Sequence, residues 1–522
     1  MNRNKLLFNR RDVGKLFAGI GVASLGAPHL LIGNAAAQPR QGGTFRMGIG
    51  GGTTTDSLDP GTWNNQFNAA FGQAFFGACL TEIDQKSNVQ PNLAESFEPS
   101  GGVQKWVFKL RKGLTFHDGR PLRPEDVVAT FQYHLNPDSK SAAKGLLSGI
   151  ETIVAESADT VVFNLKAGNA DFPFLVSDYH LPIYPANEGG GIEWEKGMGA
   201  GPYVLQKFTP GVEAIAERNP NYHKPGMPYF DRVHLLAIPD PAARNNALLS
   251  GEIDYMNQCD LKTIDLLKAN PDIEIDSVTG TYQYQALMNV TAPPFDNVDV
   301  RLAVKWALNR QELVDKIIRG YGKAGNDNPI APATKFAIQP EPVYEHDPDK
   351  ARFHLQKAGL SDLKIDFSTS DVAFTGAVDA GVLMKEQARK AGIDINIIQE
   401  AGDSYWDNVW MKKPFSMSYW GGRPTCDYAF STLYTDDSAW NDTSWKNPRF
   451  NELVRSARGE IDEAKRQGMY AEAQQLIHDD GGVIVLMFAN NVSAHTKKLA
   501  HGELNSNLSD DGYRLFERWW FV

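Results

Sequence analysis

Cysteine is scarce in this sequence, and its placement excludes two common kinds of site. Cys79, Cys259 and Cys426 are the three cysteines of a 522-residue chain, and no Cys-x-x-Cys pair occurs. An odd number of widely separated cysteines is neither a disulfide framework nor a zinc motif. We therefore expect three buried thiols, no metal site and no cofactor.

Signatures of catalysis are missing as well. The sequence contains no Gly-x-Ser-x-Gly elbow and no His-Glu-x-x-His zinc helix. Carboxylates are plentiful, but without a defined spacing they do not identify an acid/base pair. We predict that the protein is not an enzyme. An exported hydrolase and a purely interacting surface protein are the alternatives from other classes.

Long apolar runs and positive charge are also lacking. Beyond the first 37 residues, no segment approaches the ~20 apolar residues that a membrane-spanning helix needs. The net charge is −11. Residues 1–37 contain five basic residues and one acidic residue, so the remainder carries −15. A body this acidic repels phosphate backbones, which excludes nucleic acid as a partner.

Residues 1–37 have the pattern of an export signal. A basic segment with the pair Arg10-Arg11 precedes a moderately apolar stretch, and Ala35-Ala36-Ala37 fits a cleavage site. The arginine pair predicts a twin-arginine signal peptide, with a mature chain that begins at Gln38 and resides in the periplasm. An ordinary Sec leader is the alternative.

Strand and helix patterns alternate along the rest of the chain. Residues 104–110 and 159–165 alternate between apolar and polar positions, as half-buried strands do. Helical spacing predicts a helix from Asp299 to Gly320, and Asp462 begins another. Residues 483–488 form an apolar run typical of a strand buried on both faces. The alternation predicts an α/β protein with mixed sheets.

Several short motifs occur in an order that resembles a known family. They are Ala94-Glu95-Ser96-Phe97, Trp106 to Gly113, Phe116-His117-Asp118-Gly119, Gly199 to Tyr203, Asn219-Pro220-Asn221-Tyr222 and Phe295 to Arg301. The series is similar to the extracellular solute-binding protein family 5, which includes the dipeptide-, oligopeptide- and nickel-binding proteins of ABC importers. It extends over nearly all of the chain beyond the leader.

The resemblance implies a two-lobed periplasmic binding protein with a hinge and an additional inserted lobe. By that analogy, residues 38–80, 202–288 and 489–522 form binding lobe I, 81–201 the inserted lobe, and 289–488 binding lobe II. It further implies that the protein, as a monomer, captures a peptide or peptide-like small polar solute by hinge closure. The partner that receives the ligand would be an inner-membrane ABC permease.

The resemblance also directs attention to the segment after Trp420. Aligned on that segment, Gly422 stands where dipeptide-binding members carry the acid that pairs with the α-amino group of the ligand. Arg423 follows directly, and its planar fork suits a carboxylate or phosphate. The alternative is that Arg423 only pairs with Asp427 at the rim.

Aromatic rings and glycines complete the candidate site. Trp63 and Trp420 are candidate stacking walls, with burial in the core as the alternative for each. Gly421 and Gly422 either let the backbone approach a ligand or form a tight turn. The candidate ligand-binding residues are Trp63, Trp420, Gly421, Gly422, Arg423 and Asp427. An anionic opine-like conjugate, an oligosaccharide and a metal chelate are alternative ligands.

Overall fold

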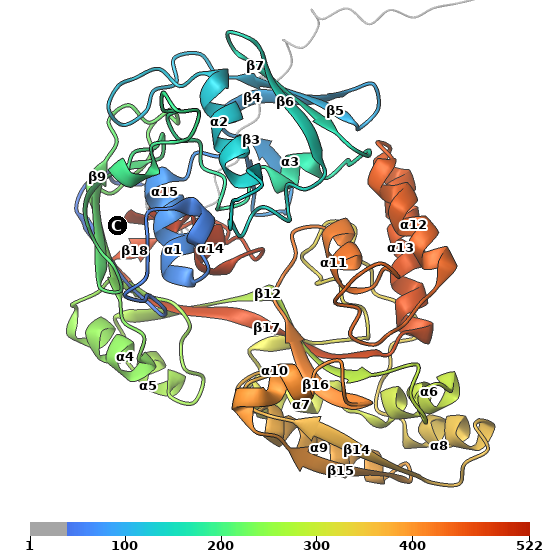
Figure 1. Ribbon diagram of the computed structural model, residues 1–522. Coiled ribbons are helices and arrows are strands. Elements are labelled where there is room, and N and C mark those ends of the chain that lie inside the picture. Colours follow the sequence, from blue (N-terminus) through green and yellow to red (C-terminus); the bar gives the residue numbers. More distant parts are fainter. Residues whose placement is uncertain (1–38) are drawn as a thin grey trace, which may run out of the picture. The chain divides into compact units, whose positions relative to one another are not determined.

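A mixed sheet of 11 strands runs through residues 39–522, the part of the chain that the computed structural model describes. The strand order is β15-β14-β16-β12-β17-β11-β1-β10-β9-β8, with β13 paired to β17. The predicted signal peptide, residues 1–37, lies outside the described residues. The strands and their covering helices confirm the predicted α/β class (Figure 1).

Two long antiparallel strands, β12 (Ile273–Met288) and β17 (Val483–Thr496), occupy the middle of this sheet (Figure 1). β17 pairs with β11 near His495, whereas β12 pairs with β16 between Gln283 and Met288. The ladder between the two long strands is interrupted between Thr279 and Gln283. Both groups of strands are therefore hydrogen-bonded to the same central pair, which has an irregularity partway along.

One group of strands lies on the β11 side of that pair. It consists of β1 (Thr44–Ile49), β8 (Tyr203–Thr209), β9 (Glu213–Arg218), β10 (Arg232–Ala237) and β11 (Tyr255–Met256). Its helices are α1 (Gln66–Phe71), α4 (Pro241–Ser250), α5 (Ile264–Lys268), α14 (Ser509–Tyr513) and α15 (Leu515–Arg518), and β18 (Leu499–Ala500) pairs with β19 (Trp520–Phe521). Phe45, Trp63 and Phe516 belong to its core.

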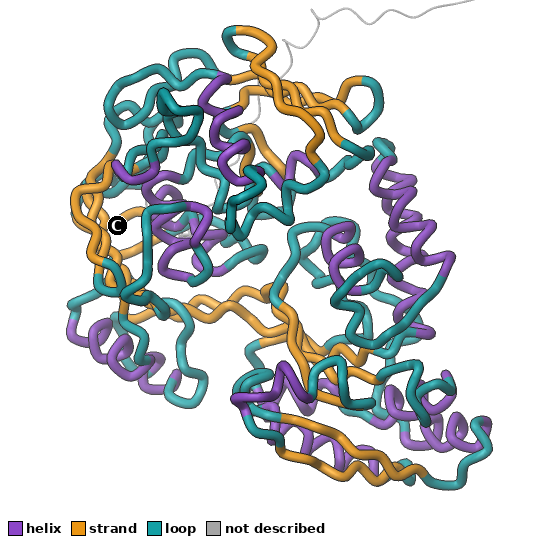
Figure 2. Tube along the Cα trace, viewed as in Figure 1, coloured by secondary structure: helices purple, strands orange, loops and turns teal. Residues whose placement is uncertain are grey.

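The other group comprises β13 (Gly322–Ala324), β14 (Leu363–Thr369), β15 (Ile393–Gln399) and β16 (Phe415–Trp420). Its helices are α6 (Val298–Ala307), α7 (Arg310–Ile317), α8 (Pro348–Lys357), α9 (Ala377–Arg389), α10 (Tyr405–Asn408), α11 (Cys426–Leu433), α12 (Pro448–Gly459) and α13 (Glu463–Asp480). The long helices α12 and α13 pack against each other (Figure 2).

A separate sheet of four strands has the order β4-β5-β7-β6. It contains β4 (Ala94–Ser100), β5 (Lys105–Leu110), β6 (Ile150–Ser157) and β7 (Thr160–Leu165), with α2 (Pro124–Leu135) and α3 (Phe172–Leu175) beside it and the hairpin β2 (Thr81–Ile83) and β3 (Val89–Pro91) nearby. All buried members of its core lie between residues 78 and 200.

This smaller sheet region contacts α12 and α13 through polar bonds, one of which is buried. Arg466 Nη2 donates to Asp171 Oδ1 at 2.6 Å, and both side chains are at most 7% exposed. The backbone N–H of Ala170 donates to the carbonyl of Arg458. These bonds join segments almost 300 residues apart in the sequence.

The structure confirms those secondary-structure predictions that depend on neighbouring residues. The strands expected at residues 104–110 and 159–165 are β5 and β7, and Asp462 caps α13 as predicted. The prediction of a single helix from Asp299 to Gly320 is wrong. Leu308 and Asn309 separate this segment into α6 and α7, and the residue that caps its start is Asn297, not Asp299.

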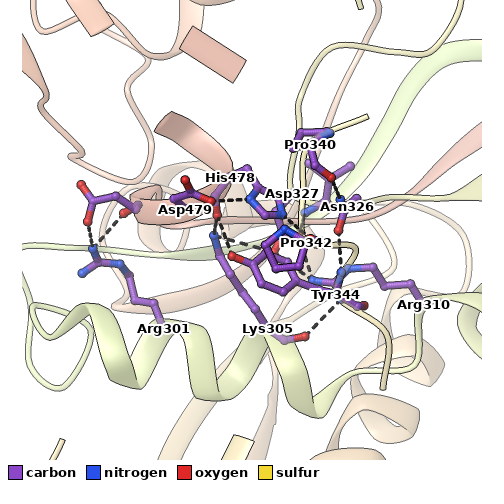
Figure 3. A network of polar contacts seen from close by, with 12 residues as sticks. Arg301, Lys305, Arg310, Asn326, Asp327, Pro340, Pro342, Tyr344, His478 and Asp479 are labelled. Atoms are coloured by element: carbon purple, nitrogen blue, oxygen red, sulfur yellow. Dashed lines mark hydrogen bonds and ion pairs between the residues drawn. The ribbon is translucent and has the colours of Figure 1, made fainter. Parts of the chain in front are cut away.

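A buried ionic cluster anchors the start of β17 (Figure 3). The Asp327 carboxylate accepts two hydrogen bonds from Arg310 Nη2, at 2.8 and 2.9 Å, and a third from the Val485 N–H. Lys305 Nζ lies 3.7 Å from the same carboxylate and donates to the carbonyl of His478. Burial lowers the pKa of Lys305 to about 8 even though Asp327 acts against that shift.

Within residues 39–522, no helix combines the length and apolar character needed to cross a membrane.

Candidate ligand-binding site

A cavity of about 440 Å³ lies where the three regions of the fold meet. Its volume is within the range of pockets that hold small ligands. Its walls come from the segment beside α1, from residues 142–146 and 174–180, from the interruption in β12, from residues 421–428 and from residues 507–513. Because these walls belong to different regions of the fold, any movement of one region relative to another changes the shape of the cavity.

Arg423 contributes an unpaired positive charge to this cavity. Its Nη1 donates to the carbonyls of Gly421 and Gly422 at 3.3 and 3.2 Å, and the guanidinium lies over the rings of Trp420 and Tyr428. Its Nε is buried without a hydrogen-bond partner. Among residues 39–522, no carboxylate forms a salt bridge with it.

The expected rim pair between Arg423 and Asp427 is absent from the described residues because Asp427 is paired elsewhere. Arg458 Nε contacts both of its carboxylate oxygens, at 3.0 and 3.1 Å. Burial raises the pKa of Asp427 to about 6, although Arg458 acts against that shift. Asp427 is not among the residues that line the cavity.

Gly421 and Gly422 both line the cavity, and neither adopts a positive φ. A Cβ atom on Gly422 would lie 1.6 Å from Thr281 Oγ1, so no side chain fits there without displacing β12. An acid at position 422 is therefore sterically excluded. The glycine lets its backbone lie close to the side chain of Thr281 and does not form a left-handed turn.

The two candidate stacking tryptophans have different surroundings. Trp63 is fully buried, donates through Nε1 to the carbonyl of Ser57 and stacks on Phe76, so its indole is part of the core and not of the cavity. Trp420 is half-buried beside the cavity, and its Nε1 donates to Asp442 Oδ2 at 2.9 Å. The Trp420 ring does not itself line the cavity, but Arg423, which does, lies over this ring.

An ion pair lies on the opposite wall. His180 Nδ1 is 2.6 Å from Asp178 Oδ1, and His180 Nε2 is 2.7 Å from the carbonyl of Trp63. Burial opposes the charged forms, but the attraction between the two groups outweighs it. The pKa of Asp178 is lowered and that of His180 is raised. The pair is neutral overall, which leaves Arg423 as the uncompensated charge among the cavity residues.

A row of aromatic rings leads away from the cavity along one wall. It begins at Tyr282, which lines the cavity, and continues by ring contacts through Tyr419, Trp406, Trp410, Trp420 and Trp440. Tyr282 is 42% exposed and Trp440 is 47% exposed. Exposed rings of this kind supply apolar faces against which a polar ligand can stack.

Several cavity residues had no signal in the sequence. Tyr282, Tyr428 and the Asp178–His180 pair lie on different elements, and the residues 507–513 come from the end of the chain. Only the adjacency of Tyr428 to the segment after Trp420 offered a hint. Histidine and acid side chains spaced to hold a metal do not occur among the cavity residues.

The fold and the cavity between its regions are those of a solute-binding protein. The sequence profile of the bacterial extracellular solute-binding proteins, family 5 (middle region), matches residues 88–442. The chain belongs to this family, as the ordered motifs predicted.

Known relatives agree with this assignment. The oligopeptide-binding protein AppA of Bacillus subtilis is 25% identical, covering 94% of this chain and 93% of its own. The glutathione-binding protein GsiB of Escherichia coli is also 25% identical, covering 92% and 95%. The solved structure of HbpA2 from Haemophilus parasuis has the same fold, with a TM-score of 0.81 at 21% identity, covering 92% of this chain and all of that one.

Proposed function

We propose that this protein is the ligand-capturing component of an ABC importer and that it binds a small peptide or peptide-like solute bearing a carboxylate. The observation that carries the proposal is Arg423, the one charge in the cavity without a counter-ion among the described residues. A guanidinium in a partly dry site binds carboxylate by two parallel hydrogen bonds. The relatives named for oligopeptide and for glutathione are consistent with a peptide ligand.

We propose that the cavity closes around its ligand. A ligand that contacts walls from separate regions stabilises the arrangement in which they are together, and its differential affinity drives closing. We place the hinge at the interrupted ladder between Thr279 and Gln283. We propose the division into lobe I (38–80, 202–288, 489–522), an inserted lobe (81–201) and lobe II (289–488). The confinement of one core to residues 78–200 supports it.

The test compares acids with their amides. Glutathione, a tetrapeptide and an opine-like acid are titrated by calorimetry, each as the free acid and as the carboxamide. Wild-type protein should prefer the acids. Arg423→Ala should weaken acid binding by roughly 2–5 kcal/mol, the cost of removing one partner of a buried charge pair. Arg423→Lys should restore part of it, because an ammonium lacks the bidentate fork.

A matched control is Arg455→Ala, which removes an arginine from the same part of the chain. Arg455 is 55% exposed and pairs with Asp436, away from the cavity. It should leave every affinity unchanged. An Arg423→Ala variant that binds the acids within about 1 kcal/mol of wild type would refute the proposed anion contact.

We further propose that the protein acts in the periplasm as a monomer, without turnover of its ligand and without a metal in ligand binding. Export would depend on the twin arginines of residues 1–37. Replacing Arg10 and Arg11 by lysine should leave the precursor in the cytoplasm, measured by fractionation and immunoblotting. Undiminished export of that variant would instead indicate a Sec leader. Ligand recovered chemically intact after incubation would support a binding role, and product release would indicate a hydrolase.

A further inference from the structure

Three side chains that commonly bind metals converge outside the ligand cavity. Asp276 lies on β12, His495 on β17, and His501 follows β18. Asp276 Oδ2 is 3.2 Å from His495 Nε2 and 3.4 Å from His501 Nε2. The three ligating atoms all lie within 4.8 Å of one another.

The strand register creates this meeting. In the antiparallel ladder of β12 and β17, Asp276 stands opposite Ser493, so His495 is its diagonal neighbour on the same face. β18, which pairs with β19, ends just before His501. Asp276 is more than 200 residues away from the two histidines in the sequence, so no sequence motif contains all three residues and no metal was expected.

Backbone contacts fix which nitrogen of each histidine is available. His495 Nδ1 is 3.0 Å from the carbonyl of Thr496, and His501 Nδ1 is 2.7 Å from that of Gly502. A carbonyl oxygen can only accept, so each Nδ1 carries the hydrogen. In the neutral imidazole, the Nε2 lone pair is then free and aimed at Asp276. This is the arrangement by which a second contact orients a metal-binding histidine.

Two of the converging atoms lack hydrogen-bond partners. His495 Nε2 and Asp276 Oδ2 are both buried, and neither forms a hydrogen bond of acceptable geometry. The His495 side chain is 1% exposed and that of Asp276 is 12% exposed. An acceptor lone pair facing a carboxylate at this distance is unfavourable, and either a proton on Nε2 or a metal cation between the two groups removes the conflict.

The distances also suit a cation. Ligand atoms at about 2.0–2.2 Å from a tetrahedral zinc ion are separated by roughly 3.3–3.6 Å. The two measured separations are 3.2 and 3.4 Å. The Trp519 ring stacks on His501 and meets His495 edge-on, which holds both imidazoles in place. A cavity of about 40 Å³ adjoins Asp276, which is room for a water molecule as a fourth ligand.

We propose that Asp276, His495 and His501 bind a divalent first-row transition-metal cation of the zinc type. Two imidazoles and a carboxylate are the ligand set that such ions favour over calcium or magnesium. The cation ties the chain after β18 to the central pair of strands. It is a structural site, separate from the ligand cavity.

The test uses tag-free protein stripped with a chelator. Zn²⁺ is titrated by calorimetry, and Co²⁺ is followed through its visible absorption bands, which report the coordination geometry directly. We expect one equivalent bound per chain and a higher Tm in the presence of Zn²⁺. His501→Gln, at the most exposed of the three positions, should weaken Zn²⁺ binding by about tenfold or more. Asp276→Asn should do the same.

The control is His234→Gln, which removes a histidine that pairs with Glu213 alone. It should bind Zn²⁺ as wild type does. Circular dichroism establishes whether each variant is folded. If the Asp276 variant does not fold, the His501 variant alone tests the site. Absence of saturable Zn²⁺ binding by the wild-type protein would overturn the proposal. So would a His501→Gln variant with the stoichiometry and affinity of wild type. In either case the cluster is an imidazolium–carboxylate pair.

Discussion

Replacing Asp442 by asparagine should make the protein less sensitive to pH. The Asp442 carboxylate is buried and has no cationic partner among residues 39–522. Its Oδ2 accepts hydrogen bonds from the indoles of Trp420 and Trp410, and its Oδ1 accepts none. Burial raises its pKa to about 6, although the two indole N–H groups act against that shift.

The sign follows from the raised pKa. Because the folded protein holds this proton more tightly than the unfolded chain, ionisation of Asp442 costs stability above pH 6, and the cost disappears as the pH falls toward 3.8. The difference between the two pKa values corresponds to about 3 kcal/mol above pH 7 and to about half of that at pH 5. Asparagine does not ionise. The free energy of unfolding of Asp442→Asn, relative to that of wild type, should therefore increase by about 1–2 kcal/mol as the pH rises from 5 to 7.5.

Urea unfolding of both proteins at several pH values measures this gain. The Oδ1 of the asparagine can accept the two indole hydrogen bonds, while its NH₂ group occupies the side where no partner exists. The unpaired NH₂ group changes the free energy of unfolding by an amount that does not depend on pH. The change with pH is therefore the quantity to compare. Asp403→Asn, at an exposed acid, is the control and should track wild type. A difference between Asp442→Asn and wild type that stays constant from pH 5 to 7.5 would refute the reasoning.

Two further predictions concern buried ion pairs. Asp327→Asn should lower the free energy of unfolding by about 3–5 kcal/mol, because Arg310 and Lys305 lose their buried counter-ion; a loss below about 1 kcal/mol in urea unfolding would contradict this. Asp171→Asn should weaken binding of acids and amides alike, because its bond to Arg466 joins two of the regions that supply the cavity walls. Calorimetry checks this, and wild-type affinities for both kinds of ligand would refute the coupling.

The sequence predicted those features that depend on neighbouring residues. Asp462 caps α13 because its side chain reaches the next backbone N–H groups, which requires no distant partner. The break between α6 and α7 is different. Gln387, far along the chain, accepts from the Asn309 N–H and donates to its carbonyl, so a tertiary contact satisfies the backbone that a continuous helix would have paired.

The same distinction between neighbouring and distant residues applies to the candidate site. Arg423 and the glycines before it lie in one loop, and the family motif located them together. The partner of Asp427 is Arg458, 31 residues away, which no spacing rule predicts. Trp63 shows a further limit, because an aromatic residue has the same sequence signal whether it faces the core or a ligand. Only the packing of Phe76 against its ring distinguishes the two.

The central strands have a consequence for how this protein can be divided. Because β17 pairs with β11 of one group and β13 of the other, and β12 joins β17 to β16, neither half of the main sheet is complete without this central pair. A fragment that ended before Val483 would expose the edges of β11 and β12, and bare strand edges recruit other chains into aggregates. Fluorescent labels that report closing should therefore be attached to the intact chain, for example at the exposed Gly149, whose backbone is not left-handed and where an added Cβ meets nothing.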